Sequence, residues 1–178
     1  MKRILCLLTA LFLTAGAYAQ TSSLPRVSDI TEVETDSGQL SLFSMCQEDS
    51  PPGYYLCVGT LGIGDEVFQV HFDPLFKLFI HLGGTLSEAL ETLRLMQAHF
   101  KEPKGTVLDL NGSFSPAFPR EDRVETVTVT SRKGLLSRYL EFSLEREGYI
   151  RATYVYKSDL NAIVSGAKFY RRLHPKEP

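Results

Sequence analysis

TLSEALETLRLMQAHFK, residues 85–101, carries the strongest helical signal in this chain of 178 residues. Thr85 followed by Glu88 forms a Thr-x-x-Glu capping box, which is typical of the first turn of a helix. Six apolar residues then recur at helical spacing and share one stripe, which predicts a helix that buries one side. They are Leu86, Ala89, Leu90, Leu93, Met96 and Phe100.

On the N-terminal side of this helix the sequence alternates and predicts strands. The expected strands are 28–35 (weak), 40–46, 54–61 and 66–72, with a turn at Gly62-Ile63-Gly64-Asp65. Residues 75–82 fit either a short helix that begins at Asp73-Pro74 or a strand, and their length and aromatic content favour the strand. Gly83-Gly84 then leads into the helix, and we expect a plain turn there rather than an anion site.

On the C-terminal side we expect strand 106–110, a turn at Asn111-Gly112, and then three closely spaced strands, 124–131, 136–144 and 149–157. In the second of these, Arg138 is in register with Leu136 and Leu140, and we expect its charged end to reach water. A short helix is expected over 160–165, which Gly166 either ends or continues.

Strands that precede and follow one amphipathic helix predict an α+β fold. We expect an antiparallel β-sheet packed against one long amphipathic helix, with a short C-terminal helix. Residues 20–37 form a polar N-terminal segment that includes the weak strand, and residues 38–178 form a single α+β domain.

Residues 1–19 have the layout of a cleaved signal peptide. Lys2 and Arg3 precede an apolar run over 4–17, and Ala17-Tyr18-Ala19 offers a cleavage site. Cys6 lies too early to be a lipid anchor. We therefore expect an exported protein, periplasmic or extracellular, with no transmembrane segment in the mature chain.

Only Cys46 and Cys57 remain after cleavage, and an oxidising compartment favours a disulfide between them. If the strands that contain them pair across the turn-forming stretch 47–53, the two residues lie opposite each other. We therefore predict one structural disulfide that braces this hairpin.

Charge and motifs narrow the class of function. The mature chain has 17 Lys and Arg against 21 Asp and Glu, a formal charge of −4, which does not favour nucleic acid as a partner. No catalytic motif is present, and the four histidines lack the spacing of metal ligands. We expect no metal and no cofactor.

These observations favour a small exported, non-enzymatic binding or structural module whose partner is a protein or a surface ligand. Tyr54 and Tyr55 are the candidate contact residues, because tyrosine is enriched at interfaces. Two alternatives stay open. One is a small hydrolase or transferase with a site near His71, Asp73 and His81, and the other is an inhibitor of a secreted enzyme that presents the loop 47–56.

Overall fold

The structure is a computed structural model that describes residues 26–35, 38–46, 53–65, 69–113, 125–146 and 149–175. The predicted signal peptide therefore lies outside the described residues. The described part contains eight strands and two helices. In chain order they are β1 (Arg26–Thr35), β2 (Gly38–Cys46), β3 (Gly53–Asp65), β4 (Gln69–Gly83), α2 (Leu86–His99), β5 (Val107–Ser113), β6 (Glu125–Lys133), β7 (Arg138–Arg146), β8 (Tyr149–Tyr156) and α3 (Lys157–Leu173).

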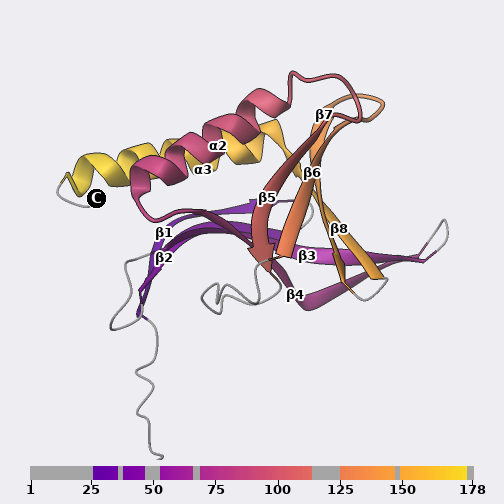
Figure 1. The fold of residues 1–178 in the computed structure, drawn as a ribbon, viewed down its shortest axis with the longest axis horizontal. Coiled ribbons are helices and arrows are strands. Elements are labelled where there is room, and N and C mark those ends of the chain that lie inside the picture. Colours follow the sequence, from indigo (N-terminus) through magenta and orange to yellow (C-terminus); the bar gives the residue numbers. More distant parts are fainter. Residues whose placement is uncertain are drawn as a thin grey trace, which may run out of the picture.

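All eight strands form one antiparallel sheet, in which each strand pairs with the next one along the chain. The sheet curls so that its last strand returns to the middle, where Ala152 of β8 pairs with Gly62 of β3. Figure 1 shows the two helices side by side above β1 and β2, with β5 to β8 turned away at one end. The expected α+β class is therefore correct, and the strand predicted over 75–82 is confirmed as part of β4.

The two helices differ from the prediction in length. Helix α2 has 14 residues, whereas α3 has 17, so one long helix with a short C-terminal partner is not confirmed. Gln97 of α2 donates a hydrogen bond of 2.6 Å to Asn161 of α3, which joins the two helices near the end of the first and the start of the second. The predicted capping box forms: Glu88 N donates to Thr85 Oγ1 over 3.2 Å, and Thr85 N donates to Glu88 Oε2 over 3.2 Å.

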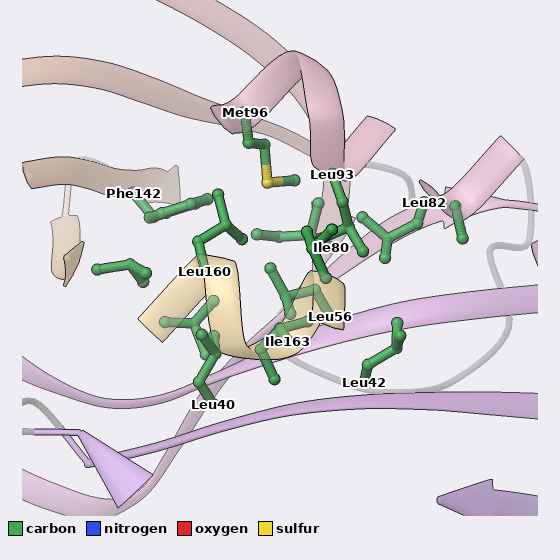
Figure 2. Packing of buried hydrophobic residues seen from close by; sticks show 14 of the residues in the cluster. Leu40, Leu42, Leu56, Ile80, Leu82, Leu93, Met96, Phe142, Leu160 and Ile163 are labelled. Carbon is green, nitrogen blue, oxygen red and sulfur yellow. The ribbon is translucent and has the colours of Figure 1, made fainter. Parts of the chain in front are cut away.

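The core lies between the helix pair and the sheet. All six predicted stripe residues of α2 are buried, and they pack with apolar residues of β2, β3, β4 and β6 to β8 in one continuous cluster. Figure 2 shows Leu93 and Met96 of α2 above Leu160 and Ile163 of α3, with Ile80 and Leu56 of the sheet below Leu93, and Leu40 and Leu42 lowest in the view. Leu95, which the stripe leaves out, is 58% exposed.

Two predicted turns are strand instead. Gly62 to Asp65 continue β3 and pair with β4, from Gly62 opposite Phe72 to Asp65 opposite Gln69. The hairpin of β3 and β4 is therefore longer than expected. Asn111 and Gly112 lie inside β5. Gly112 is needed there for close packing, since a Cβ atom at this position would lie 2.6 Å from Phe79 O of the neighbouring strand.

The C-terminal end of α2 is tied down by two side chains. His99 is buried, and its Nε2 lies 3.0 Å from Thr106 O and 3.1 Å from Val129 O. Carbonyl oxygens only accept hydrogen bonds, so Nε2 is the protonated nitrogen. Arg138 Nη1 donates to Phe100 O and to Glu102 O, and it thus binds carbonyls at the helix end, where a positive charge is favourable. Leu136, which alternation groups with the buried Leu140, precedes β7 and is 96% exposed.

Candidate functional site

The tyrosines proposed as contact residues are not on the surface. Tyr54 is 1% exposed and Tyr55 is 4% exposed. Tyr54 belongs to the main core, whereas Tyr55 stacks on Phe43 on the other side of the sheet, with ring centroids 5.6 Å apart. Consecutive residues of a strand point to opposite sides, and here both sides are covered. These two residues therefore offer no contact surface.

The predicted disulfide between Cys46 and Cys57 does not form. The register explains why. Cys57 lies opposite Ser41 on β2, whereas Cys46 lies five residues further along that strand and pairs with Arg26 of β1. Five residues of strand span about 17 Å, and an odd separation puts the two side chains on opposite sides of the sheet. That geometry is outside the reach of a disulfide.

The register also separates the histidines of the proposed hydrolase site. His71 pairs with Ile63 and His81 with Tyr55, so the two lie ten residues apart on β4. An extended strand of that length spans about 33 Å. The side chains of His71 and Asp73 lie outside the described residues, as does most of the loop proposed for an inhibitor, residues 47–52.

Three backbone donors at the N-terminus of α2 are bound by side chains of the capping box. Gly84 N donates to Glu88 Oε2 over 2.7 Å, and Thr85 N donates to the same oxygen. The Glu88 carboxylate thus sits where an external anion would bind. The turn at Gly83-Gly84 is structural, as expected, and the φ of +146° at Gly83 favours glycine there.

A different surface gathers polar and aromatic side chains. We call it the outer face: it comprises the residues of β5 to β8 that alternate with the core residues and point away from the helices. They are Val107, Asp109 and Asn111 of β5; Thr126, Thr128, Thr130 and Arg132 of β6; Tyr139, Glu141, Ser143 and Glu145 of β7; and Ile150, Ala152, Tyr154 and Tyr156 of β8.

Three tyrosines form the centre of aromatic contact on the outer face. Tyr139 of β7 lies opposite Tyr156 of β8. Tyr154 lies two residues before Tyr156 on the same strand and therefore points to the same side. Their ring centroids lie 5.9 Å (Tyr139 to Tyr154), 6.3 Å (Tyr139 to Tyr156) and 5.4 Å (Tyr154 to Tyr156) apart, with steep angles between the rings. At these distances the rings contact each other and leave no space for a cation between them. They form a half-exposed aromatic patch rather than a cage.

Polar groups surround this aromatic patch. Arg132 Nη2 lies 2.7 Å from Glu141 Oε1, and this hydrogen-bonded ion pair orients both side chains on the strands beside the tyrosines. Thr128 Oγ1 donates to Asp109 Oδ1 over 3.3 Å. Two open hollows adjoin each other on this face. One, of about 400 Å³, is lined by the three tyrosines and Glu141, and the other, of about 500 Å³, by Thr126, Thr128, Ser143, Glu145 and Ile150.

This arrangement offers contact area and hydrogen bonds. Within the described residues, no group of three or more His, Cys, Asp or Glu side chains is placed to hold a metal ion. Glu141 is engaged with Arg132, and it lies opposite Thr130 of β6 and Tyr154 of β8. The outer face is an open surface rich in aromatic rings and hydroxyl groups.

Part of this face follows from alternation along single strands. Alternation places Tyr139 with Glu141 and Ser143, and it places Tyr154 with Tyr156, and both groupings are confirmed. The missing step was the register that sets Tyr139 opposite Tyr156. The sequence does show three tyrosines at alternating positions of two neighbouring predicted strands, which is the pattern that could have indicated the patch.

Comparison with known proteins adds no relative, since no family model matches the chain, no curated protein is detectably similar and no solved structure matches its fold at a significant level. Among the described residues, neither helix is long and apolar enough to cross a membrane.

Proposed function

We propose that this chain is an exported, non-enzymatic binding module that holds a protein partner on the outer face of β5 to β8. Export rests on the signal-peptide layout of residues 1–19. The observation that carries the binding role is the aromatic patch, in which Tyr139, Tyr154 and Tyr156 stay half-exposed on an open sheet face instead of joining the core.

The composition of the outer face supports a protein as the partner. Tyrosine supplies a large rigid contact area with few rotatable bonds, and small hydroxyl and amide side chains around it adapt their hydrogen bonds to a partner. Here the tyrosines are bordered by Thr126, Thr128 and Ser143, with Asn111 at the margin. Antibody paratopes use the same combination to bind proteins.

The size of the face agrees with this choice. Four strands of seven to nine residues cover roughly 30 Å by 15–20 Å at ordinary strand spacings. A standard protein interface uses about 800 Å² of accessible surface from each partner. Side chains that project from the sheet add to its flat area, so the accessible area of the outer face is of the same order. A small molecule would leave most of such an open surface uncovered.

The test is to capture a partner and then measure its affinity for matched variants. The mature chain is immobilised, the envelope and medium of the producing cell are passed over it, and the retained protein is identified and purified. Tyr154→Ala should weaken binding of that protein by about tenfold or more in calorimetry, since central tyrosines are common hot spots. Phe169→Ala, which truncates an exposed aromatic ring on α3, is the control and should change affinity less than about twofold.

Equal losses for the two variants, or none for Tyr154→Ala, would reject the outer face as the binding surface. A thermal melt of each variant checks that both stay folded at the temperature of the binding measurement.

A further inference from the structure

A basic cavity lies on another part of the molecule, where α2 ends and where β7 and α3 begin. It has a volume of about 680 Å³. Each of these three elements contributes one cationic side chain to its lining: Lys101 follows α2, Arg138 opens β7 and Lys157 opens α3. Ser137 adds a hydroxyl group. None of the described residues that line the cavity carries a carboxylate.

Arg138 is held in place at this cavity. Its Nη1 donates to Phe100 O over 3.0 Å and to Glu102 O over 3.1 Å. Its Nε and Nη2 make no hydrogen bond to any described residue. Part of the guanidinium is therefore fixed by the end of α2, while the remaining donors stay available to a ligand. A pre-positioned guanidinium loses little freedom when it binds an oxyanion, and its planar donors match two oxygens of such a group.

The nearest carboxylate of α3 has its own partners. Asp159 Oδ2 accepts from Tyr156 N over 3.4 Å, and its Oδ1 accepts from Ser158 Oγ over 3.0 Å. This acid offsets the dipole of α3, so the inference does not rest on the helix N-terminus. The three cations outnumber it, and the cavity keeps an excess of positive charge.

We propose that this basic cavity binds a phosphate group, either of a soluble phosphate ester or of a lipid headgroup. A phosphate carries up to two negative charges and several acceptor oxygens, which suits three cations and the serine hydroxyls of this lining better than a singly charged carboxylate does. The cavity meets the outer face only at Tyr156, which lines both. The proposal is therefore independent of the protein-binding role, and either can fail without the other.

The test uses inorganic pyrophosphate as the probe in titration calorimetry at low ionic strength. The wild-type chain should bind it, and added sodium chloride should weaken binding because the contacts are charged. The double variant Lys101→Gln, Lys157→Gln should bind at least about tenfold more weakly, which corresponds to ~1.4 kcal/mol. Lys168→Gln is the matched control, since it removes the same charge from an exposed position of α3 outside the cavity, and it should stay within about twofold.

A second measurement separates the two sources of phosphate. If the wild-type chain co-sediments with vesicles of anionic phospholipid and the double variant does not, the site binds a lipid headgroup. Pyrophosphate binding without co-sedimentation assigns it to a soluble phosphate ester. No binding of pyrophosphate by the wild-type chain at millimolar concentrations, or equal binding by the double variant, overturns the proposal. Both lysines are exposed, so the double variant should fold, and its thermal melt confirms that.

Discussion

Gly166 shows how one residue without a side chain determines a contact between two elements. It lies inside α3 where this helix crosses β1, and a Cβ atom there would lie 2.6 Å from Thr31 Cβ. Glycine in a helix interior costs about 1 kcal/mol relative to alanine. The close approach of α3 to β1 therefore explains why the chain continues the helix through a glycine instead of ending it.

Gly166→Ala should destabilise the protein. Alanine gains ~1 kcal/mol of helix propensity, whereas overpacking against Thr31 costs about 1–3 kcal/mol, so we expect a net loss of up to about 2 kcal/mol in urea unfolding. Ser165→Ala, one residue earlier and exposed, is the control and should be neutral within about 0.5 kcal/mol. A more stable Gly166→Ala variant would show that α3 does not pack this closely on β1.

The cysteines should react at different rates, because their surroundings differ. Burial raises the pKa of the Cys57 thiol to about 11, although Lys77 and a hydrogen bond with Ser41 act in the opposite direction. Cys57 is therefore a thiol at pH 8 and should resist alkylation until the protein unfolds, since the thiolate is the reactive form. Cys46 is half-buried and should react first. Mass spectrometry after timed labelling measures both rates, and a disulfide in the purified protein would contradict the register of β2 and β3.

His81 should make stability depend on pH. Burial lowers its pKa in the folded state, and the Glu88 carboxylate offsets part of this shift. The unfolded chain therefore binds a proton more readily, and stability is lost as pH falls below about 6.5, the ordinary value for histidine. Between pH 7.5 and pH 5, the melting temperature of His81→Gln should fall less than that of the wild-type chain. An equal loss would mean that His81 takes no part.

At the level of elements, α2 is the element whose start and buried side are set mainly by its own residues. Its capping box fixes where it begins, its stripe fixes which side is buried, and Arg138 binds carbonyls at its end. Helix α3 depends more on its surroundings. It begins immediately after β8, it packs on β1 and α2, and its basic residues Arg171 and Arg172 lie in the last turn, where positive charge complements the dipole.

A pair of leucines in α2 tests this packing. Leu93 is fully buried between the sheet and α3, so Leu93→Ala should cost about 2–5 kcal/mol in the free energy of unfolding. Leu95→Ala, two residues later on the exposed side, should stay within about 0.5 kcal/mol. The two values are read from chemical denaturation of the purified variants, and similar costs would contradict the orientation of α2.

At the level of the whole molecule, local patterns predicted the elements and long-range contacts determined how they pair. Capping residues and alternation located α2 and most strands. Alternation leaves the register between strands undetermined, and for this reason the disulfide was predicted wrongly. Alternation also does not reveal that both sides of β3 are covered here, so the exposure of Tyr54 and Tyr55 was predicted wrongly. Gly112 is a further example. Glycine is required there because Phe79 of the neighbouring strand comes close, and this contact cannot be predicted from the sequence.

The outer face follows from the same long-range pairing. Each strand of β6 to β8 directs alternate residues to the core, and the curl that brings β8 to β3 keeps those residues on the inside. The tyrosines thus become one patch only when the sheet is assembled. The proposed binding role is therefore a property of the complete fold, and it is best tested on the intact chain.

The most direct test is photo-crosslinking in the producing cell, with p-benzoylphenylalanine in place of Tyr154 or, as the control, in place of Phe169. Both positions carry an aromatic residue at the surface, one on the outer face and one on α3. We expect a discrete crosslinked protein from position 154 and none from position 169. No crosslink from position 154, or the same crosslinked protein from both positions, would contradict the outer face as the binding surface.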